Sequence, residues 1–215
     1  SKEPCCRCTI VKKAPRREEL QMKLGSVAQV RSGLVLARKQ ARGRTEYRYP
    51  LLNLKCIHPS GYIDTDLCEM FDSVESLNPE YLTHKGDVVV RLTIPYTAVL
   101  ITADLEGYVI PSSFVVIRPD RSMLLPEYLI WLLNSQKVKK QMYEGAVSNM
   151  LGAVKPRYFA EYEIDEIPIP RQRILADLNQ LAKREAQLLA KLAADKERYY
   201  DHILNQVFTD MKRGN

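Results

Sequence analysis

The pattern of hydrophobic and polar residues divides this chain into two parts. From residue 171 to about residue 212, a stretch of about forty residues without Gly or Pro, apolar positions recur at helical spacing. They fall into three sets with seven-residue spacing and form one stripe, broader than the two-position seam of a simple coiled coil. We therefore predict one long helix, roughly 60 Å at 1.5 Å per residue, with a wide apolar face.

The residues predicted to pair with a partner helix all lie on this stripe: Ile174, Leu175, Leu178, Leu181, Leu188, Leu189, Leu192, Tyr199 and Ile203. Polar residues such as Glu185 and Asp195 interrupt the stripe, so it is not a regular zipper. Two interpretations remain open, a helix packed wholly on its own domain and a helix that acts as a spacer and pairing arm. Its length favours the second, because a small domain cannot cover a helix of this size.

Residues 21–170 carry the mixed pattern of an α+β domain. The β-branched run at residues 88–92 predicts a buried strand, and other strand-like runs lie at 49–57, 98–103, 113–117 and 162–167. A helix is predicted from residue 126 to about 143, with Pro and Glu at its start and lysines near its end. Residues 34–49 and 145–158 are predicted loops. The predicted fold is α+β: a globular domain with a mixed β-sheet and short helices, then one long C-terminal coiled-coil-type helix.

Composition adds few constraints. The chain has 215 residues, enough for one domain with an extension, and its 46% hydrophobic and 27% charged residues are ordinary for a globular protein. Residues 1–20 are polar and basic, and we expect a flexible lead-in there. No run approaches the roughly eighteen apolar residues of a membrane span, and the first residues lack a signal-peptide core. We therefore expect a cytoplasmic protein with no membrane partner.

Positive charge is concentrated rather than spread. The net charge is +6, and Lys and Arg crowd at residues 12–17 and 31–48. A basic patch of this kind favours a polyanionic partner. The predicted loop at residues 34–49 either contacts phosphates or base edges through its arginines, or is simply a solvated loop.

The sequence lacks the common catalytic and cofactor-binding motifs of enzymes. It has neither a phosphate-binding GxxxxGK[ST] loop nor a GxGxxG motif after a strand, and no histidine lies beside a candidate nucleophile. Cys5, Cys6 and Cys8 cluster without the second ligand pair of a zinc site, while Cys56 and Cys68 stand alone. We expect reduced thiols, no metal, no cofactor and no catalytic activity.

Several short motifs, in order along the chain, are similar to those of the specificity (S) subunit of type I restriction-modification systems. They are LGSVAQVRSG at residues 24–33, KGDVVVR at 85–91, PEYL and LNS within 126–135, the glycine- and serine-containing segment at 145–151, and IPIPRQ at 167–172. The chain resembles one half of such a subunit, with one target-recognition domain at residues 21–170 and one spacer helix at residues 171–212. The family's second proline pair and the Glu before the Gln are missing here, and residues 5–8 have no counterpart.

The resemblance implies a non-catalytic DNA-recognition subunit. Such a subunit binds double-stranded DNA, holds methyltransferase (modification) subunits and, in the complete complex, works with the restriction subunit. With one recognition domain, the chain is expected to bind a half-site of a bipartite target and to form a homodimer through antiparallel spacer helices. Two alternatives remain: a stand-alone DNA-binding module or orphan recognition domain that does not assemble with a methyltransferase, and a scaffold that binds no nucleic acid.

Candidate DNA contacts come from the two predicted loops and the sheet edge, and they rest on physical reasoning rather than on the resemblance. Lys and Arg would meet phosphates, while Ser148, Asn149 and one Arg would reach base edges. The full set is Arg38, Lys39, Arg42, Arg44, Arg91, Thr93, Ser148, Asn149, Lys155, Arg157 and Tyr158.

Overall fold

A four-stranded antiparallel sheet forms the centre of the domain, in the order β2-β7-β5-β6. In the computed structural model, which describes residues 21–147 and 154–213, these strands are β2 (Ala28–Ser32), β7 (Phe114–Pro119), β5 (Val88–Arg91) and β6 (Ala98–Leu100). The β-branched run at residues 88–92 is confirmed as a buried strand, because Val88, Val89 and Val90 are all fully buried.

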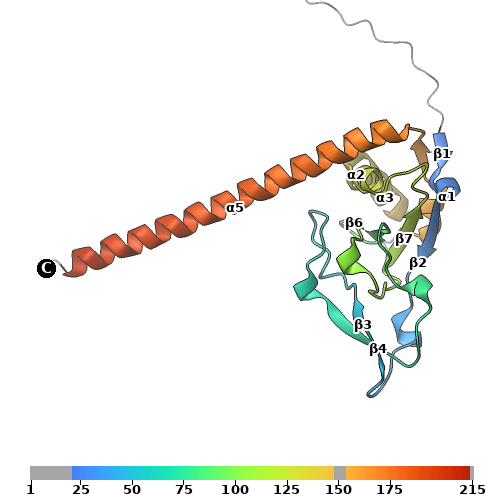
Figure 1. Ribbon diagram of the computed structural model, residues 1–215, viewed down its shortest axis with the longest axis horizontal. Helices are drawn as coiled ribbons and strands as arrows, with labels where there is room; N and C mark the ends of the chain where they lie inside the picture. Colours follow the sequence, from blue (N-terminus) through green and yellow to red (C-terminus); the bar gives the residue numbers. More distant parts are fainter. Residues whose placement is uncertain (1–20, 148–153, 214–215) are drawn as a thin grey trace, which may run out of the picture.

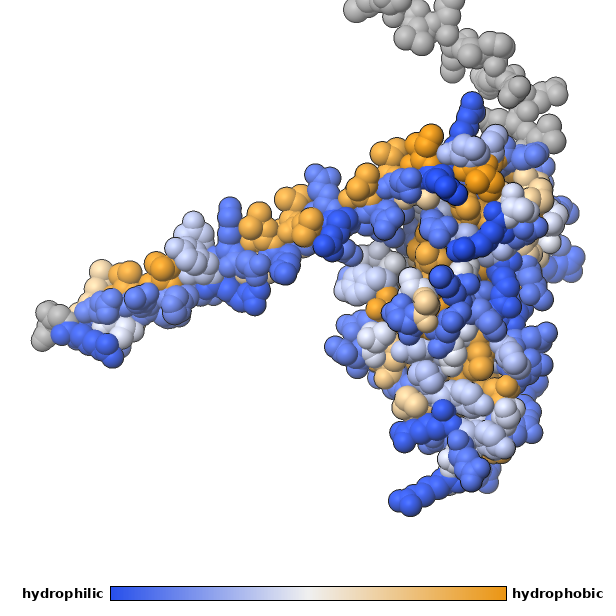
Figure 2. Space-filling model, viewed as in Figure 1, coloured by the Kyte–Doolittle hydropathy of each residue, from blue (hydrophilic) through white to orange (hydrophobic). Residues whose placement is uncertain are grey.

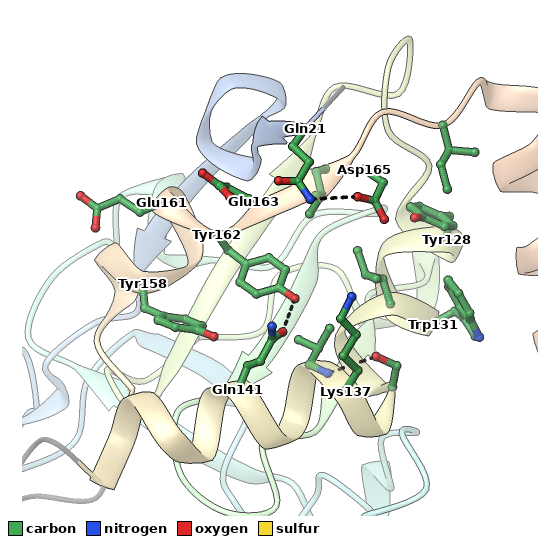
Figure 3. A pocket seen from close by; sticks show the side chains of 15 residues that line it. Gln21, Tyr128, Trp131, Lys137, Gln141, Tyr158, Glu161, Tyr162, Glu163 and Asp165 are labelled. Atoms are coloured by element: carbon green, nitrogen blue, oxygen red, sulfur yellow. Dashed lines mark hydrogen bonds between the residues drawn. The ribbon is translucent and has the colours of Figure 1, made fainter. Parts of the chain in front are cut away.

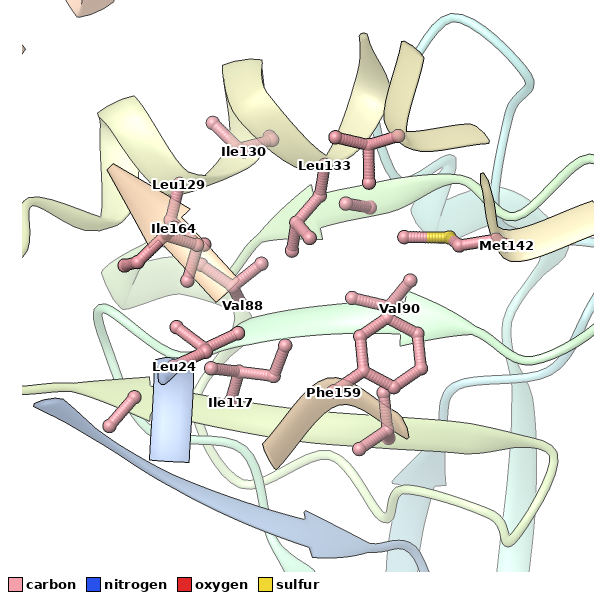
Figure 4. Packing of buried hydrophobic residues seen from close by; sticks show 14 of the residues in the cluster. Leu24, Val88, Val90, Ile117, Leu129, Ile130, Leu133, Met142, Phe159 and Ile164 are labelled. Carbon is pink, nitrogen blue, oxygen red and sulfur yellow. The ribbon is translucent and has the colours of Figure 1, made fainter. Parts of the chain in front are cut away.

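Both faces of this sheet are covered, and the alternation of side chains along each strand decides which core they enter. Val88 and Val90 point toward α2 (Pro126–Asn134) and α3 (Gln136–Val147), and pack with Leu129, Leu133 and Met142 (Figure 4). Val89 joins a second cluster on the opposite face. A strand buried on both faces explains why its sequence shows no polar alternation.

Two smaller strand pairs complete the domain. β1 (Gln21–Lys23) pairs with β8 (Glu163–Asp165), and β3 (Tyr47–Leu51) pairs with β4 (Glu69–Ser73). Short helices connect the strands: α1 (Leu24–Val27), α4 (Pro156–Glu161), η1 (Leu36–Arg38), η2 (Thr65–Leu67), η3 (Pro79–Tyr81) and η4 (Ala103–Leu105). The β1–β8 pair brings the start of the described chain beside the segment that leads into the long helix (Figure 1).

Several predicted boundaries were wrong. The helix expected at residues 126–143 is two helices, because Ser135 adopts an extended backbone and its hydroxyl accepts a hydrogen bond from Val138 in the first turn of α3. The loop expected at 145–158 is helical at both ends, since α3 reaches Val147 and Pro156 begins α4. The loop expected at 34–49 contains η1 and the start of β3.

The long helix is confirmed as α5 (Ile169–Arg213), 45 residues and roughly 68 Å in length. It begins two residues earlier than predicted and projects from the domain (Figure 1). Gln172 fixes its first turn to the domain. The buried amide of Gln172 accepts a hydrogen bond from Leu125 N at 2.8 Å and donates to the carbonyls of Met123 and Ile167 at 2.8 and 2.7 Å.

α5 presents two different faces. Residues at three- and four-residue spacing, from Gln172 through Ala176 to Lys183, are buried or half-buried on the domain side. Ile174, Leu178, Leu181, Leu188, Leu189, Leu192 and Tyr199 are each more than half exposed. At about 100° per residue these two sets lie on roughly opposite sides of the helix, and the apolar side faces away from the domain (Figure 2).

Two predicted pairing residues differ from the others. Leu175 packs against the domain core, so it belongs to the domain side of α5 rather than to the exposed stripe. Ile203 is half-exposed, whereas every other residue from 184 to 213 is exposed. No helix in the described part of the chain combines the length and apolar character needed to cross a membrane.

Candidate nucleic-acid interface

The basic loop between β2 and β3 is fixed along β4. Ala41 N donates to the carbonyl of Asp72, and Val74 N donates to the carbonyl of Lys39, each at 2.9 Å. These bonds place the loop at the end of the domain that is remote from α5 (Figure 1). Arg38, Arg42 and Arg44 are exposed on it.

The cations of this loop differ in how far they are neutralised. Lys39 forms an ion pair with Glu75, and Arg48 in β3 lies 3.5 Å from a carboxylate oxygen of Asp72. Within the described residues, Arg38, Arg42 and Arg44 have no such partner. Three exposed guanidinium groups free of carboxylates are suited to phosphate or to guanine edges.

A second group of predicted residues comes together at the end of β5. The guanidinium of Arg91 donates to the hydroxyl of Thr93 at 3.0 Å. Val154 N donates to the carbonyl of Leu92 at 2.9 Å, which places Lys155 close to this strand end. Arg157 lies on α4 and forms an ion pair with Glu161 at 2.7 Å. Ser148 and Asn149 lie outside the described residues.

Tyr158 has a different environment from the other predicted contacts. Its ring packs beside those of Phe159 and Tyr162, with centroids 5.6 and 5.8 Å apart, and burial raises its pKa. It lines a cavity of about 630 Å³ together with Glu161, Glu163 and Asp165 (Figure 3). Carboxylates repel phosphate, so these surroundings favour a packing role for Tyr158 over a DNA contact.

A partly buried charge cluster connects β2 and β7 with the residue that precedes β5. The guanidinium of Arg118 donates two hydrogen bonds to the buried carboxylate of Asp87, at 2.7 and 2.8 Å, and these bonds raise the pKa of Arg118. All three guanidinium nitrogens of the neighbouring Arg31 are buried without a hydrogen-bond partner among the described residues. Burial, and then the charge of Arg118, lower the pKa of Arg31.

The two described cysteines are free thiols. Cys56 is buried, and burial raises its pKa to about 12, while burial also raises the pKa of the half-buried Cys68. A thiol with a raised pKa is a poor nucleophile and a poor metal ligand. In the part of the chain that the structure describes, no group of His, Cys, Asp and Glu has the arrangement needed to hold a metal ion.

Lys139 and Lys183 were missed in the sequence and are placed together by the fold. Both are half-buried where α3, α5 and the turn at residues 59–61 meet. In the sequence each is one of many lysines on a helix, for which a solvated face is the ordinary interpretation. One signal in the sequence could have located Lys183. It lies eleven residues, or three helical turns, after Gln172, and therefore on the same side of the helix.

Comparison with solved structures identifies the fold. The chain superimposes on the HsdS subunit from Thermoanaerobacter tengcongensis with a TM-score of 0.62 and 17% sequence identity, over 82% of this chain and 45% of that subunit. A chain from a type I restriction-modification system, studied for complex assembly and conformational transition, gives a TM-score of 0.60 at 18% identity, over 79% and 43%. The fold is that of HsdS, a type I specificity subunit.

This chain spans less than half of the length of the two proteins compared above. No protein-family profile and no curated protein matches the sequence. The likeness extends over about four fifths of this chain, and at this level of sequence identity it shows the fold alone.

Proposed function

We propose that this chain is the DNA sequence-specificity subunit of a type I restriction-modification system. It binds one half-site of a bipartite duplex target, forms a homodimer through antiparallel α5 helices, and recruits methyltransferase subunits and, in the complete complex, the restriction subunit. Residues 21–170 are its target-recognition domain and residues 171–212 its spacer helix. Catalysis belongs to the partner chains.

The exposed apolar face of α5 is the observation that carries this proposal. Seven large hydrophobic side chains from Ile174 to Tyr199 are more than half exposed on one side of a helix that its own domain does not cover. An exposed apolar surface of this extent is typical of an interface. A second copy fits it, because an antiparallel twofold pair brings the same stripe to both sides of the contact.

The basic loop supports DNA as the ligand. Arg38, Arg42 and Arg44 are exposed and lack carboxylate partners within the described residues, on a chain with a net charge of +6. In an antiparallel dimer, two such loops would lie several tens of ångströms apart, comparable with one or more turns of DNA at about 34 Å each. This spacing is what a bipartite target requires.

The pairing of α5 is tested by the double substitution Leu181→Glu and Leu188→Glu. Four carboxylates in the apolar contact of the dimer should prevent pairing, so light scattering should give about 25 kDa instead of about 49 kDa, twice the chain mass of 24.7 kDa. The midpoint of domain unfolding should not change, since both leucines are exposed.

The matched control is Arg184→Glu with Gln187→Glu, which introduces negative charge on another side of the same helix segment. This variant should remain a dimer. A monomeric unaltered chain, or a dimer that survives the leucine substitutions, contradicts pairing through α5. Addition of the cognate methyltransferase subunit to the unaltered dimer should raise the measured mass further, and its failure to do so would favour a stand-alone DNA-binding module.

A further inference from the structure

A cleft of about 350 Å³ lies at the junction between α5 and the domain. Three elements form its walls: the end of α2 with the start of α3, one face of α5, and the turn at residues 59–61. Its lining is polar and cationic: Pro59, Ser60, Trp131, Asn134, Ser135, Gln136, Lys139, Asn179 and Lys183. None of these side chains is a carboxylate.

Lys139 and Lys183 bring two positive charges into this cleft without a counter-charge. Neither lysine forms an ion pair with any described residue, although nine such pairs occur elsewhere. Burial lowers the pKa of Lys183, and burial followed by the charge of Lys183 lowers the pKa of Lys139. Two half-buried ammonium groups that repel each other are stabilised by a shared anion.

The walls of the cleft are held in place. The ring of His58 stacks on that of Tyr62 with centroids 4.4 Å apart, and His58 accepts hydrogen bonds from Ser60 N at 3.1 Å and Gly61 N at 2.9 Å. The amide of Asn134 joins α2 to β6 through two hydrogen bonds with Ala98, at 3.1 and 2.8 Å. A binding site with fixed walls loses little entropy when a ligand arrives.

Gly61 allows the turn to approach Lys183 closely. Its φ of +85° is unfavourable for other residues, and a Cβ there would lie 3.1 Å from the Lys183 ammonium nitrogen. The cavity next to Tyr158 is a contrast, because three carboxylates and one lysine, Lys137, line it, and this negative balance disfavours an anion. Among the described cavities, the chemistry of this cleft therefore points to a phosphate-sized anion with hydrogen-bond acceptors.

We propose that the cleft binds one backbone phosphate of the DNA duplex, with Lys139 and Lys183 sharing its charge and Ser60, Gln136 and Asn179 donating hydrogen bonds. This inference rests on the proposed DNA-binding function and adds a contact outside the basic loop. Because α5 and the domain both line the cleft, the phosphate sets the direction of the duplex relative to α5. The contact fixes orientation and reads no base.

The test is the double substitution Lys139→Met and Lys183→Met, with binding of a random-sequence 30-base-pair duplex followed by fluorescence anisotropy over a series of salt concentrations. The slope of log affinity against log salt should become shallower by about 1, and affinity at 0.1 M salt should fall about three- to tenfold. The loss should be the same for duplexes of different sequence, as for any phosphate contact.

The matched control is Lys140→Met with Lys191→Met, which removes one charge from each of the same two helices at exposed positions outside the cleft. The salt slope of the control should differ from that of the unaltered chain by less than about half of the change seen with the cleft variant. Equal slopes for the two variants overturn the cleft site and leave DNA binding intact. An unaltered chain that binds no duplex overturns the proposed function, and the cleft site with it.

Discussion

Arg31 is a single residue whose environment conflicts with its chemistry. It lies on β2 beside the Arg118–Asp87 pair, and its three guanidinium nitrogens are buried without hydrogen bonds among the described residues. A buried charge without hydrogen bonds destabilises a fold, since it loses its hydration and gains no hydrogen bond to replace it. Attraction to the Asp87 and Glu80 carboxylates offsets part of this effect.

Replacement of Arg31 by Met should therefore stabilise the domain. We expect the free energy of unfolding in urea to rise by about 1–2 kcal/mol, because the thioether keeps most of the packing and removes the unpaired charge. Arg121→Met, at an exposed position with an ion pair to Glu127 at 3.5 Å, should change stability by less than about 0.5 kcal/mol. A destabilised Arg31→Met domain would mean that Asp87 depends on both arginines.

At this scale the sequence predicted the apolar residues better than the charged ones. Val88 to Val90 form a β-branched run, and such a run indicates a buried strand whatever its position in the sheet. The cluster around Asp87 depends instead on strand register, which places residues 31, 87 and 118 side by side although they are far apart in the chain. The basic loop was predicted, but which of its cations remain unpaired depends on Glu75 and Asp72 in or next to β4.

Among the elements, α5 depends on one side chain for its attachment. The amide of Gln172 satisfies one backbone N–H and two backbone carbonyls from the segments before α2 and before α5. Without that amide, three backbone polar groups lose a hydrogen bond at a partly buried junction.

The substitution Gln172→Ala should lower the free energy of unfolding by about 2–3 kcal/mol, measured by urea denaturation followed through the fluorescence of Trp131. Gln180→Ala, two turns further along α5 and exposed, is the control and should be within about 0.5 kcal/mol of the unaltered chain. Equal effects of the two substitutions would show that Gln172 is not the attachment point.

Element types were predicted more reliably than element ends. The helix at residues 126–143 and the strand at 88–92 have long, regular patterns. The break at Ser135 has no Gly or Pro, and its reason is a serine cap that is visible only once the turn exists. Pro156 fits a loop as well as the first turn of a helix, and the packing of Phe159 in the core decides in favour of α4.

For the whole molecule, the length of α5 has a measurable consequence if the chain pairs as proposed. Deletion of residues 185–191 removes one heptad and shortens the arm by roughly 10 Å without changing the side on which the stripe lies. The gap between half-sites, read from methylation of a randomised duplex library with the cognate methyltransferase, should decrease by about 3 base pairs. A seven-residue insertion at the same position should increase it by the same amount, and an unchanged gap in both variants would refute the spacer role.

The position of α5 against the domain was beyond sequence reasoning. The repeat of apolar residues predicted a wide stripe, but not that Leu175 would leave it to pack on the core. The cleft with Lys139 and Lys183 exists only because α5 crosses the ends of α2 and α3 next to a turn from residues 59–61. No local pattern contains that arrangement.

Beyond Lys183, every described residue of α5 is exposed except the half-exposed Ile203. Helices in proteins owe most of their stability to the packing of an amphipathic face rather than to intrinsic helix propensity. If the chain pairs as proposed, folding of the arm and association with a second copy are coupled, so dilution should melt the arm while the domain stays folded. In such a dimer each chain would stabilise the last two thirds of its partner's helix, so the concentration of the chain would set how much of the arm is folded.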